Sequence, residues 1–340
     1  MSWPSWLPLR ETLRPMSPYG APQVPAVAAL NTNENPYSPS PALQKAITDA
    51  VAKVAVDLNR YPDRDATILR TKLATYINEG NGTSFTLDNI WAANGSNEII
   101  QSIFLAFAQG AVLGFTPSYS MHPLIAKTTG AQWIDGKRNA DFSLNTTDAV
   151  SEILKNKPTL TFITTPNNPT GGAVTLAEIQ KLADAAKDVG GLLVVDEAYA
   201  EFSQEVSAVT LIANNPHLIV IRTMSKAFAF AGARLGYLVS DVAVKDAMMI
   251  VRLPYHLSAL TQAAAQVAID HRAELLSGVS TLIKARGEVV QALHDMGLTT
   301  ITSSANFVLF TGFKQDAPQL WAALLEKGVL IRDVGLSGYL

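Results

Sequence analysis

Short apolar runs alternate with amphipathic segments through the middle of the chain, and this alternation restricts the possible folds more than any other feature. In the amphipathic segments apolar residues recur every three or four positions, as on one face of a helix. Such alternation is typical of a mainly parallel sheet with helices on both faces. We therefore predict an α/β fold of the seven-stranded type, with strands starting at 90 and spanning 111–115, 131–134, 160–165, 192–195, 218–221 and 235–239.

The pattern changes after about residue 241, where long helical stretches come before short apolar runs. Helices are predicted at 41–51, 65–79, 98–107, 120–129, 146–156 and 175–189 before that point, and at 243–253, 260–276, 278–296 and 317–326 after it. Short strands are predicted at 298–301, 306–310 and 329–332. We expect a large domain at 41–250 and a smaller α+β domain at 251–340.

Residues 1–40 hold many of the prolines and show little periodicity, which predicts an extended arm with turns. The arm carries Trp3, Trp6 and Tyr19. These aromatic side chains favour an arm that packs on a partner subunit and on the small domain, and they count against a disordered tail.

The charge and the residue content exclude several classes of function. With 26 basic and 29 acidic residues the chain has a formal net charge of −3, so it shows no basic surface signal for nucleic acid or an anionic membrane. The sequence contains no cysteine, which excludes disulfides and thiolate metal sites, and no metal centre is predicted. The first residues do not resemble a signal peptide, and no apolar run is long enough to span a bilayer, so we expect a cytoplasmic protein.

Polar clusters follow five of the predicted strands, at the carboxyl ends where ligands collect in parallel sheets. At the first of these ends, Gly95, Ser96 and Asn97 form a strand–turn–helix junction whose backbone N–H groups can bind an anion. Ser96 or Asn97 is the expected helix cap. Each cluster alone is also typical of an ordinary turn, but their shared position at successive strand ends indicates a common binding site. The clusters are 94–97, 118–119, 167–168, 196–199 and 223–226.

Lys226 follows a buried-type strand and lies among small and apolar residues. Loss of hydration lowers the pKa of such an amine and makes it a nucleophile toward carbonyls. Thr223, Ser225 and Arg234 lie close in sequence and are typical of an anion site. The alternative is a lysine at a strand end that extends its ammonium group to solvent.

An aromatic heterocycle that carries an aldehyde and a phosphate would engage all of these groups. Lys226 can condense with the aldehyde, and Asp196 can keep a ring nitrogen protonated. Tyr199 and Asn168 can hydrogen-bond a ring oxygen. Tyr119 offers a stacking face. Each residue alone also has a structural explanation: Asp196 as a helix cap, Tyr199 at the edge of the core, Asn168 in a turn, and Arg234 in a surface ion pair.

Several motifs resemble the fold-type I pyridoxal-phosphate aminotransferases. They are Asn167-Asn-Pro-Thr-Gly171, Asp196-Glu-Ala-Tyr199, Ser225-Lys-Ala-Phe228 and Ala231-Gly-Ala-Arg-Leu-Gly-Tyr237. Within that family, in the class II subgroup, the chain most resembles the histidinol-phosphate aminotransferases. This narrower resemblance rests on Leu30-Asn-Thr-Asn-Glu-Asn-Pro36, Arg60-Tyr-Pro62 and Pro254-Tyr-His-Leu-Ser-Ala-Leu-Thr-Gln262, and it covers nearly the whole chain.

The resemblance implies a role for each residue of the cluster. Lys226 would be the Schiff-base lysine and Asp196 the partner of the pyridine nitrogen, and these two form the catalytic set with Tyr199. Asn168 and Tyr199 would bind the ring oxygen, and Tyr119 would stack on the ring. The implied phosphate ligands are Gly95, Ser96, Asn97, Thr223, Ser225 and Arg234, with Tyr61 of the partner subunit, so that the site requires a homodimer. Tyr19, Asn33, Asn168 and Arg332 match positions near the substrate.

The implied reaction is the transamination of L-histidinol phosphate with 2-oxoglutarate in histidine biosynthesis, with ping-pong kinetics. Three alternatives stay open from the sequence. The chain could be an aromatic amino-acid aminotransferase of the same fold, a phosphothreonine-type decarboxylase, or a regulator that binds pyridoxal phosphate without turnover. The regulator is disfavoured because no basic stripe or DNA-binding module accompanies the fold.

The sequence departs from the family pattern at its end. After a Gly-Tyr-Leu like that of residues 338–340, the family continues with an arginine that helps to hold the substrate anion and with a final strand. Either the chain is truncated or its end is missing from the sequence. With the sequence as it stands, we expect Arg332 to hold the anion largely alone, with weaker substrate binding and intact cofactor binding.

Overall fold

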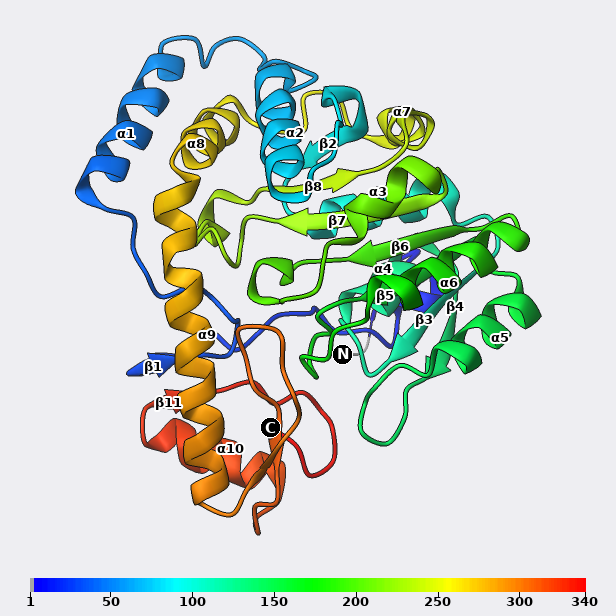
Figure 1. Ribbon diagram of the computed structural model, residues 1–340, viewed down its shortest axis with the longest axis vertical. Coiled ribbons are helices and arrows are strands. Elements are labelled where there is room, and N and C mark those ends of the chain that lie inside the picture. The colour runs from blue at the N-terminus through cyan, green and yellow to red at the C-terminus, as the bar shows by residue number, and fades with distance from the viewer. Residues whose placement is uncertain (1–2) are drawn as a thin grey trace.

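A seven-stranded sheet forms the centre of the molecule, whose computed structural model describes residues 3–340 (Figure 1). The strand order is β2-β8-β7-β6-β5-β3-β4, and β8 is antiparallel to both of its neighbours. The other six strands are parallel, so the predicted mainly parallel α/β sheet is confirmed. The strands are β2 (Ile90–Ala93), β3 (Ala111–Thr116), β4 (Gln132–Lys137), β5 (Leu160–Thr164), β6 (Leu192–Asp196), β7 (Leu218–Thr223) and β8 (Gly236–Val239).

Helices cover both faces of this sheet. All six residues of β7 are buried, and its four apolar side chains alternate between two apolar layers, with Val220 in one and Ile221 in the other. The first layer includes side chains of α2, α5, α6 and α8, and the second includes side chains of α3, α4 and α7. Burial of each large apolar side chain contributes roughly 1.5–3 kcal/mol. These helices are α2 (Thr67–Asn81), α3 (Ser96–Phe107), α4 (Met121–Thr129), α5 (Thr146–Asn156), α6 (Leu176–Asp188), α7 (Val242–Val251) and α8 (Ala259–Asp270).

The start of α3 differs from the sequence prediction. The N-cap residue is Gly95, with φ of 86°, and no side chain caps the helix, so neither Ser96 nor Asn97 takes that role. A positive φ is available to glycine at little cost because it has no Cβ. The first N–H groups of α3 are therefore left free of a side-chain partner, which matters for anion binding.

The carboxyl-terminal part is also helical but breaks at a different residue from the one predicted. Helices α8 and α9 (Arg272–Asp295) meet at His271, whereas the sequence pattern placed the break near Gly278. Gly278 lies inside α9, and a Cβ there would come within 2.7 Å of the Tyr37 ring. This glycine therefore admits the arm and does not end a helix.

The remaining elements of this part are short. Helix α10 (Ala317–Glu326) has the predicted limits, but each strand is two residues long: β9 (Thr299–Thr300), β10 (Phe310–Thr311) and β11 (Val329–Leu330). Strands β9 and β10 pair with each other.

The arm pairs with a strand from the carboxyl-terminal part of the sequence. After a 3₁₀ turn at Glu11–Leu13, strand β1 (Ala28–Ala29) pairs in parallel with β11, next to it in Figure 1, and helix α1 (Pro41–Ala55) packs against α8. Within residues 3–340, no helix is both long and apolar enough to cross a membrane.

Candidate active site

The predicted polar clusters lie along one edge of the sheet. Strands β2, β3, β5, β6 and β7 are parallel, so their carboxyl ends face the same way. Strands β5, β6 and β7 stay paired up to their carboxyl ends: Thr164 of β5 is the register partner of Asp196 of β6, and Glu197 N, just after β6, donates to Ile221 O of β7. The side chains that follow β5, β6 and β7 are thereby held next to one another.

The Lys226 amine lies between the arm and the end of β6. Its Nζ donates to the Thr32 carbonyl at 2.7 Å and lies 5.8 Å from the centroid of the Tyr199 ring. Burial is the main cause that lowers the pKa of Lys226 to about 8; Glu34 opposes the shift and the nearby Arg234 charge adds to it. An appreciable fraction of this amine is therefore neutral at neutral pH, as a nucleophile or a base requires.

Asp196 ends β6 with its carboxylate buried. Its Oδ1 accepts a hydrogen bond from Ala198 N at 3.2 Å, and its Oδ2 lies 3.2 Å from His122 Nε2. His122, a buried side chain on the first turn of α4, was not among the predicted site residues. Its position three residues after Tyr119 could have indicated it, because residues three apart in a helical turn lie on the same side.

The Tyr199 hydroxyl receives two hydrogen bonds. Asn33 Nδ2 donates to it at 3.1 Å and Asn168 Nδ2 at 3.2 Å. Burial raises the pKa of Tyr199 to about 12, so the phenol keeps its proton at neutral pH. Because its oxygen accepts both bonds, the O–H remains available to donate to a ligand.

A compact cradle forms where β2 enters α3. A Cβ at Gly95 would lie 2.5 Å from Arg234 Nη2, and a Cβ at Gly236 would lie 2.4 Å from Ser96 N. The backbone of Gly95 and Ser96 and the Arg234 guanidinium are therefore in close contact. Thr223 Oγ1 donates to Ser225 Oγ at 3.0 Å near the same strand ends. Free helix N–H groups, hydroxyls and a guanidinium are the donor set that binds a phosphate.

The donor set as a whole fits pyridoxal phosphate. The cradle suits its phosphate, the Lys226 amine its aldehyde, the buried Asp196 carboxylate its ring nitrogen, and the Tyr199 hydroxyl its ring oxygen. Tyr119, the expected stacking residue, donates its hydroxyl proton to Asn97 Oδ1 at 3.1 Å. Asn97 thus contacts the stacking residue.

Two of the predicted substrate residues, Tyr19 and Arg332, form a second group at the arm. Arg332 Nη2 donates to the Tyr19 hydroxyl at 3.2 Å, and the Tyr19 hydroxyl also accepts from Ser120 Oγ at 3.3 Å. Asn33 belongs to the first group, because its side chain donates to Tyr199, and its carbonyl accepts from Asn306 Nδ2 at 3.1 Å.

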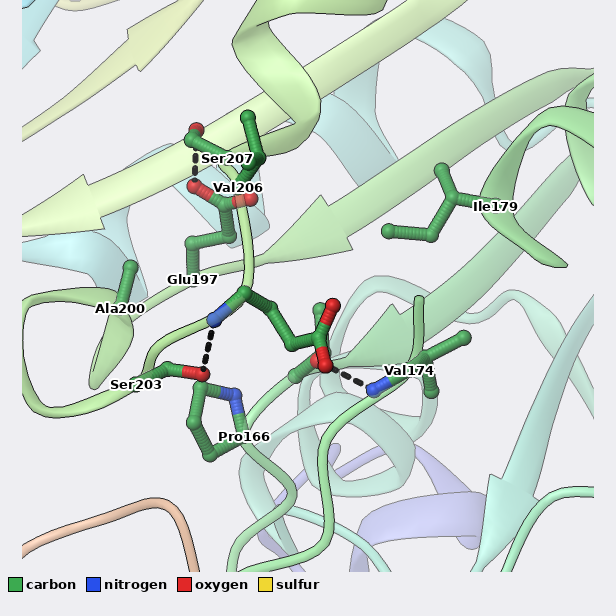
Figure 2. A pocket seen from close by; sticks show the side chains of 10 residues that line it. Pro166, Val174, Ile179, Glu197, Ala200, Ser203, Val206 and Ser207 are labelled. Carbon is green, nitrogen blue, oxygen red and sulfur yellow. Dashed lines mark hydrogen bonds between the residues drawn. The ribbon is translucent and has the colours of Figure 1, made fainter. Parts of the chain in front are cut away.

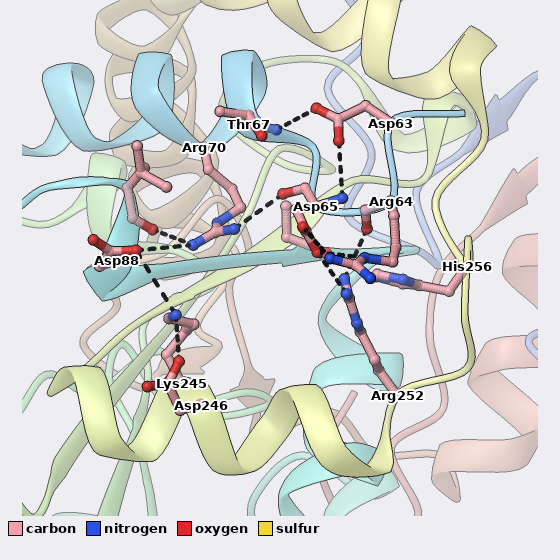
Figure 3. Close-up of polar contacts among 12 residues, drawn as sticks. Asp63, Arg64, Asp65, Thr67, Arg70, Asp88, Lys245, Asp246, Arg252 and His256 are labelled. Atoms are coloured by element: carbon pink, nitrogen blue, oxygen red, sulfur yellow. Dashed lines mark hydrogen bonds and ion pairs between the residues drawn. The ribbon is translucent and has the colours of Figure 1, made fainter. Parts of the chain in front are cut away.

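Tyr61 stands apart from the other predicted site residues. It is 79% exposed, and its described aromatic contact is with Tyr255, at 4.4 Å between ring centroids. The loop after it is fixed to the end of α7, since Arg252 Nη1 donates to the Arg64 carbonyl at 2.7 Å and Arg252 Nη2 pairs with Asp65 at 2.6 Å (Figure 3). Tyr61 is therefore presented outward on a rigid loop.

The fold and the lysine-centred site agree with a comparison against protein-family models. The model described as "Aminotransferase class I and II" matches residues 25–339. The chain therefore belongs to the class I and II aminotransferase family.

Within that family, curated histidinol-phosphate aminotransferases are close in sequence. Those of Mycobacterium sp. (strain JLS) and Mycobacterium marinum (strain ATCC BAA-535 / M) are each 52% identical over 337 residues, which is 98% of this chain and 89% and 87% of those proteins. Among solved structures, the histidinol-phosphate aminotransferase from Clostridium acetobutylicum has a TM-score of 0.82 at 23% identity, covering 92% of each chain. The Sinorhizobium meliloti enzyme in complex with pyridoxal-5'-phosphate has a TM-score of 0.79 at 23% identity, covering 91% of this chain and 83% of that one. At such identities the structural likeness shows the fold.

Proposed function

We propose that this chain catalyses the transamination of L-histidinol phosphate with 2-oxoglutarate, giving imidazole-acetol phosphate and glutamate in histidine biosynthesis. It is an aminotransferase by family, and its cofactor is pyridoxal 5'-phosphate. The observation that carries the proposal is the half-buried Lys226, with its lowered pKa, at the same sheet edge as the buried Asp196 and Tyr199. The identity of 52% to curated histidinol-phosphate aminotransferases supports the choice of substrate.

In this proposal each part of the cofactor is assigned to residues that lie together in the site. The backbone of Gly95 and Ser96, with Thr223, Ser225 and Arg234, holds the phosphate. Asp196 holds the positive charge of the ring nitrogen, and His122 fixes the carboxylate beside it. Tyr199 donates its free O–H to the ring oxygen together with Asn168 Nδ2, while Tyr119 covers the ring and is oriented by Asn97.

The chemistry divides between the cofactor and Lys226. Pyridoxal phosphate, when bound, supplies an aldehyde that reacts with amines and a ring that withdraws electrons. Once the amino donor has displaced Lys226 from the cofactor, Lys226 Nζ accepts the proton from the substrate carbon that bears the amino group. Its pKa of about 8 lies close to neutral pH, where a base of this strength can both accept and return a proton.

The substrate anion is assigned to the arm side of the site. Arg332 and Tyr19 supply a guanidinium and a hydroxyl that are already hydrogen-bonded to each other. Asn33 donates to the Tyr199 hydroxyl, so its amide is placed to contact a substrate bound beside Tyr199. A phosphate monoester carries the charge and the acceptor oxygens that such a donor pair binds.

We also propose a homodimer in which Tyr61 of the partner subunit reaches the cofactor phosphate. Tyr61 is exposed, and apolar side chains shortly before it in the chain and at the end of α7, to which its loop is fixed, are exposed too: Val56 at 78%, Ile250 at 84% and Leu253 at 75%. A surface of this kind is typical of a protein–protein contact. Sedimentation of the holoenzyme, and of a Tyr61→Phe variant titrated with cofactor, tests the arrangement. A wild-type monomer would contradict it.

The domain limits and the location stay predictions. We keep an arm at 1–40, a large domain at 41–250 and a small domain at 251–340, with the observation that α8 of the small domain packs on α1 and α2. The cytoplasmic location predicted from the sequence is likewise kept as a proposal.

The decisive experiment is Lys226→Ala with a panel of amino donors. The variant is expected to lose turnover and the visible absorbance of the lysine-bound cofactor, whereas Lys245→Met keeps both. Lys245 is a matched control because it is a buried lysine, paired with Asp246 on α7 (Figure 3). The wild type is expected to prefer histidinol phosphate to phenylalanine and tyrosine. Turnover by Lys226→Ala at the wild-type rate would exclude the mechanism, and a preference for the aromatic donors would exclude the substrate.

A further inference from the structure

We propose that Arg222, held between Glu197 and Glu201, is a positioning residue that sets the separation of the two strand ends carrying the reacting groups. We call Arg222, Glu197 and Glu201 the Arg222 triad. The inference rests on the proposed function, because it assumes that Lys226, which follows β7, reacts beside Asp196 at the end of β6.

The triad connects β7 to the segment after β6 in two places. Arg222 Nε forms an ion pair with Glu197 Oε2 at 2.8 Å, without hydrogen-bond alignment, and Arg222 Nη1 donates to Glu201 Oε1 at 2.9 Å. The exposed fractions of the three side chains are only 6%, 4% and 11%. Screening by solvent is therefore weak, and the two contacts hold the segment at both ends.

The triad occupies the opposite face of the sheet from Asp196. Successive side chains of a strand point to opposite faces of the sheet. Glu197 therefore points to the face opposite Asp196, and Arg222 points to the face opposite Thr223. The contacts agree: Asp196 lies against His122 of α4, while Glu197 Oε2 accepts from Ser207 Oγ at 2.7 Å, a contact drawn in Figure 2. Each strand end thus has a proposed cofactor ligand on one face and a triad member on the other.

Neighbouring groups keep Arg222 charged and hold the two carboxylates of the triad by hydrogen bonds. Burial lowers the pKa of Arg222, but the carboxylates of Glu197 and Glu201 outweigh it and raise the pKa above its ordinary value. Two phenols complete the environment: Tyr76 of α2 donates to Glu201 Oε1 at 3.4 Å, and Tyr237 of β8 is the register partner of Arg222. Glu197 Oε1 also accepts from Ala208 N at 2.7 Å.

Loss of the guanidinium would leave two carboxylates facing each other in the interior. Breaking a buried ion pair on one side is strongly unfavourable because the remaining charge has no partner. The segment 197–201 would move away from β7 to relieve this, and it carries Tyr199, whose ring centroid lies 5.8 Å from Lys226 Nζ. A displacement of about 1 Å at a reacting centre can slow catalysis on the order of a hundredfold.

The test compares Arg222→Met and Arg222→Lys with Lys245→Met in the holoenzyme. Lys245→Met removes a buried cation on α7, away from both strand ends. The readouts are kcat and KM for histidinol phosphate, and the pH midpoint of the visible absorbance change of the bound cofactor. Arg222→Met is expected to lose about tenfold or more in kcat, with KM changed less than threefold, and to shift the absorbance midpoint. Arg222→Lys should recover part of both, and Lys245→Met should change neither.

A combined variant separates positioning from folding. Glu197→Gln, Glu201→Gln and Arg222→Met together remove all three charges, so no unpaired charge is left to prevent folding. This variant is expected to fold and bind cofactor, yet to keep the kcat loss and the shifted absorbance midpoint. Wild-type kcat and midpoint in the combined variant, or in a folded Arg222→Met, would overturn the proposal. An inactive wild type would instead contradict the proposed function, so the two failures are distinguishable.

Discussion

Replacing Lys226 with methionine should stabilise the cofactor-free protein at pH 7. The pKa of this lysine falls from 10.5 to about 8 in the folded protein. At about 1.36 kcal/mol per pKa unit, keeping the ammonium in its buried site costs the folded state about 3 kcal/mol at pH 7. The amine also donates to Thr32 O, a contact worth about 1 kcal/mol. Methionine removes both, so the net gain is about 2 kcal/mol at pH 7.

The gain should depend on pH with a definite sign. Between pH 8 and pH 10.5 the unfolded chain binds more protons at Lys226 than the folded chain does, so the stability of the wild type rises with pH in that window. The advantage of Lys226→Met is therefore full below pH 8 and lost by about pH 10.5. Taking the difference between the two proteins cancels the titration of groups that they share.

Urea unfolding of the cofactor-free proteins, followed by tryptophan fluorescence at pH 7 and pH 10, measures this difference. Lys245→Met is the control, because it loses an ion pair to Asp246 and should gain no stability at pH 7. A difference between Lys226→Met and wild type that stays constant from pH 7 to pH 10 would refute the reasoning. So would a Lys226→Met that is less stable than wild type at pH 7.

Two further predictions concern the cofactor contacts. Gly236→Ala places a Cβ 2.4 Å from Ser96 N, so cofactor affinity should fall about tenfold or more in a fluorescence titration, whereas Gly287→Ala, with open space around it, should leave affinity unchanged. Equal affinities of the two variants would count against the cradle. His122→Phe keeps an aromatic ring against Phe162 but removes the contact with Asp196, so kcat should fall about tenfold and the cofactor absorbance should titrate at a different pH. Unchanged kcat and titration would show that Asp196 acts without His122.

The sheet and its helices could be predicted well because their signals are local. The helix at 146–156 has the predicted limits, since Asn145 accepts from two backbone N–H groups at its start and the apolar positions follow helical spacing. The polar clusters at the strand ends were visible for the same reason. Helix limits were predicted less well where they depend on contact with a segment far away in the sequence. The predicted break between 276 and 278 is absent, and Gly278 lies inside α9 against the Tyr37 ring of the arm.

The same limit applies within the site. Lys226, Asp196 and Tyr199 could be singled out because each follows a buried strand. His122 and the Arg222 triad could not, because their meaning lies in contacts across the fold: His122 with Asp196, and Arg222 with Glu197 and Glu201. A histidine on a helix, or an acidic pair after a strand, has no distinctive pattern in one sequence.

The pairing of β1 with β11 also has a consequence for the order in which the protein matures. Ala28 and Ala29 are synthesised early, but their partners are Val329 and Leu330, roughly three hundred residues later. During translation, segments fold as they emerge, amino-terminal ones first. The sheet can therefore assemble while the arm still waits for its partner strand. The Thr32 and Asn33 contacts with Lys226 and Tyr199 follow directly after β1, so the reactive lysine is covered only after Val329 and Leu330 have been synthesised.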